Sequence, residues 1–122
     1  MRPYENLDAR KSSHQLFLRI HRATEGWPKR EWYGLAAQVR RSAFSVAANI
    51  VEGHAKRGRR EFRRYLDIAW ASYCETRYAI HAATELALLD QQTVAQLARL
   101  EEETGKKLWG LIRSIDAGNG RP

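Results

Sequence analysis

The spacing of apolar residues constrains the fold of this chain more than any other feature. In the segment between residues 35 and 50 the apolar side chains recur every three or four positions, at Leu35, Val39, Ala43, Val46 and Ile50. This interval places them on one face of an α-helix, which turns once in about 3.6 residues. No segment alternates polar and apolar residues as a half-buried strand does, so the sequence predicts an all-α fold.

The same reasoning predicts four helices with short connections. They are expected at about residues 8–25, 32–52, 59–88 and 92–115. Gly26 and Pro28 should end the first helix and Gly53 the second, because glycine and proline both favour helix ends. Short connections make consecutive helices antiparallel neighbours. We therefore predict a single domain over residues 1–122, an antiparallel up-down four-helix bundle, with residues 118–122 as a frayed tail.

The net charge of +7 comes from one third of the chain. Ten basic residues and three acidic ones lie between Lys29 and Arg64, and ten minus three gives the whole excess. A neutral body with one concentrated basic segment indicates a binding surface for an anionic partner.

The densest basic cluster surrounds the expected start of the third helix. Its members are Lys56, Arg57, Arg59, Arg60, Arg63 and Arg64. Arginines oppose the partial positive charge of a helix N-terminus, and the N–H groups there favour a phosphate. Only one acid, Glu61, lies among them, so we expect few internal partners. The cluster predicts binding to nucleic acid phosphates, and the alternative is a solvated face with scattered ion pairs.

Two further arginines and a polar stripe lie on the expected second helix. Arg40 and Arg41 are second candidates for nucleic-acid contact, or one of them pairs with Glu75 or Asp67 on the third helix. The stripe contains Gln38, Ser42, Ser45, Asn49 and Glu52. Together with Glu75, its members are expected to serve structure rather than chemistry.

Catalytic and metal-binding patterns are weak in this sequence. The four histidines lack HExxH or Cys/His spacing, and no serine lies in a nucleophile-elbow motif. The carboxylates Glu52, Glu61, Asp67 and Glu75 are better suited to neutralising arginines than to acid–base catalysis. We therefore predict no enzymatic activity, no metal and no cofactor, with a small carboxylate enzyme as a minor alternative.

The expected location is the cytoplasm. Cys74 is the sole cysteine and cannot form an internal disulfide, which fits a reducing compartment, and its apolar surroundings in the sequence suggest a core position. The longest stretch without a charged residue, Ser42 to Val51, is too short to cross a bilayer.

Mixed polar and apolar identities in the middle of the chain resemble a known family. They are Tyr33-Gly34-Leu35, Gln38-Val39-Arg40-Arg41, Ser45-Val46, Asn49-Ile50, Glu52-Gly53, Glu61-Phe62, Tyr65-Leu66, Ile68-Ala69, Ser72 and Glu75, with Leu111-Ile112-Arg113-Ser114 near the end. The chain is similar to the four-helix-bundle proteins encoded in 23S rRNA intervening sequences, a family that includes the accessory variability protein of diversity-generating retroelements. Arg10, Ala71 and Ala87 stand where that family often has tryptophan, glycine and glycine, and we expect alanine to fit the two helical positions.

The resemblance implies a ring-shaped homopentamer that is associated with nucleic acid and has no catalytic activity. It also implies a protein partner such as a reverse transcriptase. The sequence thus predicts a cytoplasmic bundle that binds RNA or DNA, as an accessory factor in RNA processing or reverse transcription. The alternative is a protein–protein adaptor whose basic face docks an acidic partner.

Overall fold

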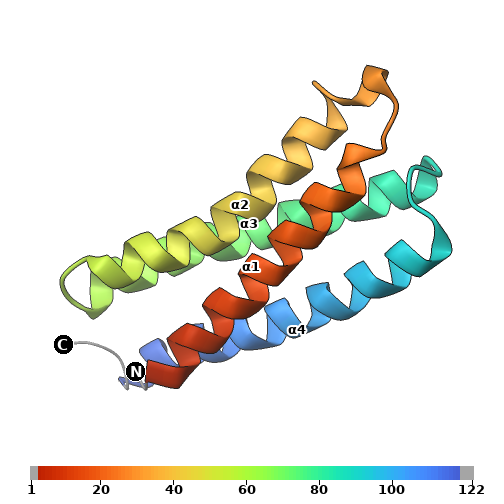
Figure 1. The fold of residues 1–122 in the computed structure, drawn as a ribbon. Coiled ribbons are helices and arrows are strands. Elements are labelled where there is room, and N and C mark those ends of the chain that lie inside the picture. The colour runs from red at the N-terminus through yellow and green to blue at the C-terminus, as the bar shows by residue number, and fades with distance from the viewer. Residues whose placement is uncertain (1–2, 119–122) are drawn as a thin grey trace.

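The computed structural model describes residues 3–118, and all regular structure within that range is helical. The elements are α1 (Pro3–Glu25), a short 3-10 helix η1 (Lys29–Glu31), α2 (Leu35–Ala55), α3 (Arg59–Glu85) and α4 (Gln91–Asp116). Consecutive long helices run antiparallel, and the start of α1 and the end of α4 lie at the same end as the α2–α3 turn (Figure 1). The predicted all-α four-helix arrangement is therefore confirmed.

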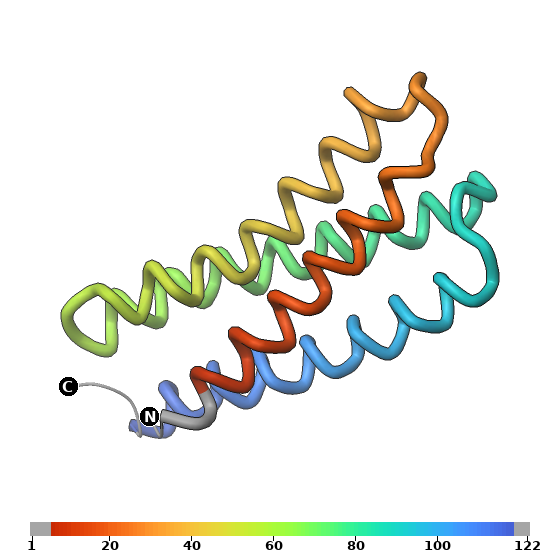
Figure 2. Tube along the Cα trace, viewed as in Figure 1, coloured from red at the N-terminus to blue at the C-terminus, as the bar shows by residue number. Residues whose placement is uncertain are grey.

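Each long helix packs against two others around the bundle. α2 lies along α3, α1 contacts both α2 and α4, and α3 contacts α4, as the tube view allows the reader to follow (Figure 2). The core has two apolar clusters. The cluster nearer the α2–α3 turn includes Val46, Ile50, Phe62, Leu66, Leu108 and Leu111. The cluster nearer the other end includes Leu16, Ile20, Trp27, Val39, Ile80 and Leu97.

The helix boundaries differ from the expected ones for local reasons. α1 begins at Pro3, because proline is accepted in a first helical turn, where its missing N–H has no partner to lose. η1 and the following turn delay α2 until Leu35. Of the tail predicted from residue 118, Gly118 closes the last turn of α4 by donating its N–H to the Ile115 carbonyl at 3.0 Å, and residues 119–122 lie outside the described range.

Gly53 does not end α2, contrary to the prediction. The helix continues to Ala55, and Gly53 is buried inside it. A Cβ atom at Gly53 would lie 2.6 Å from Cβ of Tyr65 and 3.1 Å from Cδ1 of Phe62. Glycine is therefore needed here because α2 and α3 approach closely, rather than because the backbone turns.

Ala87 is also placed differently from the expectation. It is exposed outside α3 with φ of 58°, so it does not continue the helix. The Leu88 N–H donates to the Ala83 carbonyl and the Ala87 N–H to the Thr84 carbonyl, at 3.0 and 3.1 Å. This pair of bonds is the Schellman ending of a helix, in which the left-handed position favours glycine.

Replacing Ala87 with glycine should therefore stabilise the bundle by up to about 1 kcal/mol, because a Cβ atom is unfavourable in left-handed backbone. Thermal unfolding followed by circular dichroism measures the change. The matched control is Ala71→Gly, at an exposed position within α3, which should destabilise by about 1 kcal/mol through lost helix propensity. Equal signs for the two substitutions would contradict the assigned backbone at Ala87.

Two smaller expectations are resolved as well. Cys74 is exposed on α3, so its predicted core position is wrong. Within the described part of the chain, none of the helices combines the length and the apolar character that crossing a bilayer requires.

Candidate nucleic-acid interface

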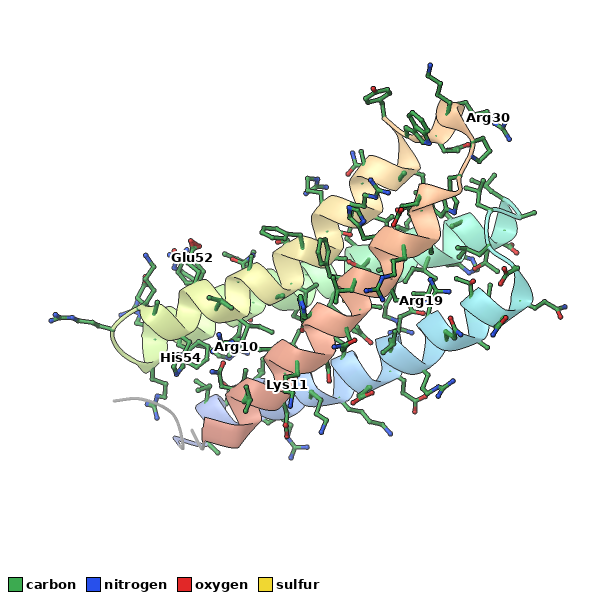
Figure 3. All side chains as sticks on the ribbon, in the orientation of Figure 1. Arg10, Lys11, Arg19, Arg30, Glu52 and His54 are labelled. Carbon is green, nitrogen blue, oxygen red and sulfur yellow. The ribbon has the colours of Figure 1, made fainter. Side chains whose placement is uncertain are left out.

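The turn between α2 and α3 positions the basic cluster. Lys56 is the C-cap residue that follows α2 and has extended backbone, and Gly58 is the N-cap residue before α3, with φ of 86°, a positive value that favours glycine. The chain therefore reverses within three residues and places basic side chains on both sides of the turn. We call Lys56, Arg57, Arg59 and Arg60 the basic tip. Side chains of this turn extend beyond the end of the bundle, past the labelled Glu52 and His54 (Figure 3).

Three arginines of the basic tip have no acidic partner among the described residues. Arg57, Arg59 and Arg60 are all exposed, and no carboxylate among the described side chains, those of residues 6–118, lies within ion-pair distance of them. Their charges are therefore available to an external anion. Arg59 and Arg60 also line an open surface pocket between the start of α3 and the end of α4. Its wall includes Ile115 and the ion-paired Arg63 and Asp116.

Arg63 and Arg64 do have internal partners, which corrects the expectation of few such contacts. The Arg63 Nε donates to Oδ1 of Asp116 at 2.7 Å, and its guanidinium also pairs with Asp67 one turn along α3. The hydrogen bond to Asp116 raises the pKa of Arg63. Arg63 thus ties the start of α3 to the end of α4 and serves structure first.

Arg64 pairs with Glu61 within α3, with 3.1 Å between Nε and Oε1. The hydrogen bond from Arg64 lowers the pKa of the Glu61 carboxyl. Glu61 therefore neutralises Arg64, which is the role expected for it.

Tyr65 is a member of this region whose role the sequence reasoning missed. The Arg64 Cζ lies 4.7 Å from the centroid of its ring and the Lys56 Nζ lies 5.5 Å from it. Cations over an aromatic face gain electrostatic attraction, so Tyr65 holds two basic side chains near the turn. The available signal was an aromatic residue directly after the last arginine of the cluster.

The start of α3 adds backbone donors to the same surface. Gly58 is the N-cap residue and offers no side chain to the first N–H groups of the helix, and no side-chain cap bond forms there. Uncapped N–H groups at a helix start favour an anion. The basic tip therefore places exposed guanidinium groups beside a helix N-terminus, and both attract an anion.

Arg40 and Arg41 are not brought to the basic tip. Arg40 precedes Lys56 by 16 positions along α2, which corresponds to about 24 Å. Its Nε donates to Oγ1 of Thr24 at 2.6 Å and its Nη2 to the His21 carbonyl at 3.3 Å, so it binds α1.

Arg41 pairs with Glu75 on α3 at 2.8 Å, one of the two partners proposed for it. That pair is exposed rather than buried, and Asp67 instead pairs with Arg63.

The polar stripe of α2 forms hydrogen bonds at the α2–α3 interface. The Ser42 and Thr76 hydroxyls lie 2.8 Å apart, as do those of Ser45 and Ser72. Asn49 donates to the Ser45 carbonyl at 2.8 Å. Gln38 accepts a bond from Arg41, whereas Glu52 is exposed at the edge of the stripe. These bonds account for the small polar side chains of the stripe without assigning them any chemistry.

Among the described carboxyl groups, burial raises the pKa of Glu101 on α4, which the sequence reasoning did not single out. Its side chain is 16% exposed and its nearest cation, Nε of Arg77, lies 3.9 Å away. Burial raises its pKa above the ordinary value of 4.5. Because the pKa is raised in the folded state, protonation of Glu101 stabilises the fold. This contribution to stability is complete below the ordinary pKa of 4.5 and is lost as the pH rises through the folded-state pKa.

Glu101→Gln should therefore raise the melting temperature at pH 7, and the difference from the wild-type protein should vanish as the pH falls to about 4, where Glu101 is itself neutral. Calorimetry at both pH values measures this. Glu102→Gln is the matched control because the neighbouring carboxylate is 71% exposed and pairs with Lys106. A lower melting temperature for Glu101→Gln at pH 7 would show that the Arg77 pair outweighs the burial.

A metal centre receives no support from the described residues. No group of three or more histidine, cysteine or acidic side chains there is arranged to hold an ion.

Comparison with known proteins identifies relatives of this bundle. A sequence model of the 23S rRNA-intervening sequence protein family matches residues 5–110. A crystal structure of a protein of unknown function from the S23 ribosomal protein family of Bacteroides thetaiotaomicron superposes with a TM-score of 0.78 at 20% identity, over 89% of this chain and 98% of that one. Curated proteins give no match. The structural likeness supports the fold, and the match over residues 5–110 shows that the chain belongs to the 23S rRNA-intervening sequence protein family.

Proposed function

We propose that this protein is a non-catalytic nucleic-acid-binding bundle whose basic tip contacts the phosphates of RNA or DNA. The observation that carries the proposal is the contrast within the arginine cluster. Arg63 and Arg64 are held by carboxylates of the chain, whereas Arg57, Arg59 and Arg60 are exposed without such partners. Unpaired positive charge that projects from a turn is well suited to backbone phosphates, which carry no sequence information.

The assembly and the setting are part of the same proposal. Five copies form a ring, which would multiply the basic tip and raise avidity without new contacts. Large apolar side chains remain exposed on the single chain, including Phe44 at 59% and Trp109 at 49%, and they offer surface for such contacts. Sedimentation should then give five times the monomer mass. We place the protein in the cytoplasm, as an accessory factor to RNA processing or to a reverse transcriptase.

The alternative is an adaptor that docks an acidic protein through the basic tip. The exposed aromatic residues favour it, since aromatic and arginine side chains dominate protein interfaces.

Fluorescence anisotropy separates the two functions. Labelled RNA and DNA duplexes should bind with an affinity that falls steeply with salt, while a labelled polyglutamate chain of equal charge should bind more weakly. Tighter binding of the polyglutamate than of both duplexes would favour the adaptor.

A further inference from the structure

The end of the bundle opposite the basic tip carries a second cluster of basic and aromatic residues. It comprises Lys29 and Arg30 of η1, then Trp32 and Tyr33 of the following turn, with Arg40 one helical turn into α2. Arg30 projects from this end, whereas Glu52 and His54 lie toward the other (Figure 3). The proposed function uses none of these residues.

The two aromatic side chains line an open pocket. Its wall also includes Thr24, Glu25, Ala36 and Arg40, and its volume is about 430 Å³. The Trp32 Nε1 donates to the Trp27 carbonyl at 3.0 Å, which fixes the indole although its side chain is 45% exposed. Tyr33 is 89% exposed. The exposed ring of Tyr33 and the fixed indole of Trp32 offer flat faces on which a base can stack.

Arg40 supplies a fixed positive charge to this pocket. Its bonds to Thr24 and to the His21 carbonyl hold the guanidinium in place, yet both partners are neutral. No carboxylate of the described residues lies within ion-pair distance of Arg40, and the nearby Glu25 lies 3.9 Å from Nδ1 of His21. A guanidinium has five N–H donors, so donors remain for an oxyanion beside the aromatic rings.

We propose that this pocket binds an unpaired nucleotide of a single-stranded nucleic acid, with the base stacked on Tyr33 and Trp32 and a phosphate at Arg40. Stacking surfaces next to a positive charge are the combination that single strands require, because every base has an aromatic face and every linkage a phosphate. Lys29 and Arg30 are both exposed and extend the positive surface toward the next phosphate, with Nε of Arg30 at 4.0 Å from Oε2 of Glu31. A duplex cannot use this pocket, since its bases are already stacked within the helix.

This inference rests on the proposed function in one respect, which is that the ligand is a nucleic acid. The pocket itself lies at the end of the bundle opposite the basic tip. The test therefore uses two labelled single strands of about 12 nucleotides, a length within the site sizes of single-strand binders. One carries adenine bases and the other is abasic, with the same number of phosphates. The variants are Tyr33→Ser, Tyr33→Phe and, as a matched control, Tyr78→Ser, which removes another tyrosine that is 71% exposed.

Tyr33→Ser should weaken binding of the adenine strand by about fivefold or more, because fivefold is the smallest effect expected when stacking of one base is lost. The affinity for the abasic strand should not change. Tyr33→Phe should bind both strands as the wild type does, because it keeps the ring, and so should Tyr78→Ser. Equal affinities of the wild type and Tyr33→Ser for the adenine strand would overturn the inference. Substitutions in the basic tip should weaken both strands alike, so failure of the proposed function would be seen separately.

Discussion

Replacing Arg57, Arg59 and Arg60 together with glutamine is expected to weaken binding of a nucleic acid duplex by roughly 30-fold or more at low salt, because three phosphate contacts and their released counterions are lost. All three side chains are exposed and have no acidic partner among the described residues, so their removal should leave the helix content and the melting temperature nearly unchanged. Anisotropy titrations and circular dichroism on the same samples measure both quantities.

The matched control removes the same charge from another surface. Lys11, Arg22 and Arg99 are exposed on α1 and α4 and none belongs to the α2–α3 turn, and their joint replacement by glutamine lowers the net charge equally. This variant should lose only the small, long-range part of the attraction, which salt screens. If both triple variants lost the same affinity, binding would depend on net charge alone and the basic tip would not be the site.

Phe62→Ala should produce the largest loss of stability, about 3–5 kcal/mol, because the substitution leaves a cavity in a tightly packed part of the core. Phe62 is completely buried, contacts the His54 ring with 5.6 Å between centroids, and lies where α2 and α3 approach at Gly53. A domain of this size has a free energy of unfolding of about 5–15 kcal/mol, so the variant loses a large share of it. Urea denaturation measures the change.

Tyr78→Ala is the control for this substitution, since Tyr78 is exposed and the removal of its ring should change stability by no more than about 0.5 kcal/mol. The Phe62 variant, where it is still folded, should also bind duplexes more weakly, because the α2–α3 turn loses its support. A loss of less than about 1 kcal/mol for Phe62→Ala would contradict the close packing of these two helices beneath the basic tip.

The helices were predictable from the sequence because their signals are local and repeated. Spacing of three or four residues identified the apolar face of α2, on which Val39, Ala43, Val46 and Ile50 are all buried. The errors lie where one residue serves a contact with a distant segment. Gly53 was expected to end a helix, and only the position of Tyr65 on the neighbouring helix shows why glycine is required inside it.

The site was less predictable because charge in a sequence does not show its partners. Glu61 was known to be near Arg64, but Asp116 lies 53 positions after Arg63 and meets it only in the folded bundle. The left-handed backbone at Ala87 was also missed, because alanine stands where glycine would have indicated the end of a helix. Within this cluster, folding makes Arg63 a link between α3 and α4, pairs Arg64 with Glu61 on the surface of α3, and leaves Arg57, Arg59 and Arg60 exposed without an ion pair among the described residues.

The most direct test of the central claim is the salt dependence of duplex binding, compared between the wild-type protein and the Arg57, Arg59 and Arg60 glutamine variant. The slope of the logarithm of the affinity against the logarithm of the salt concentration counts the phosphate contacts, at about 0.9 for each. If the basic tip makes these contacts, the variant should have a slope shallower by about 2 to 3. Equal slopes for the two proteins would show that these arginines do not contact phosphates and would contradict the proposed function.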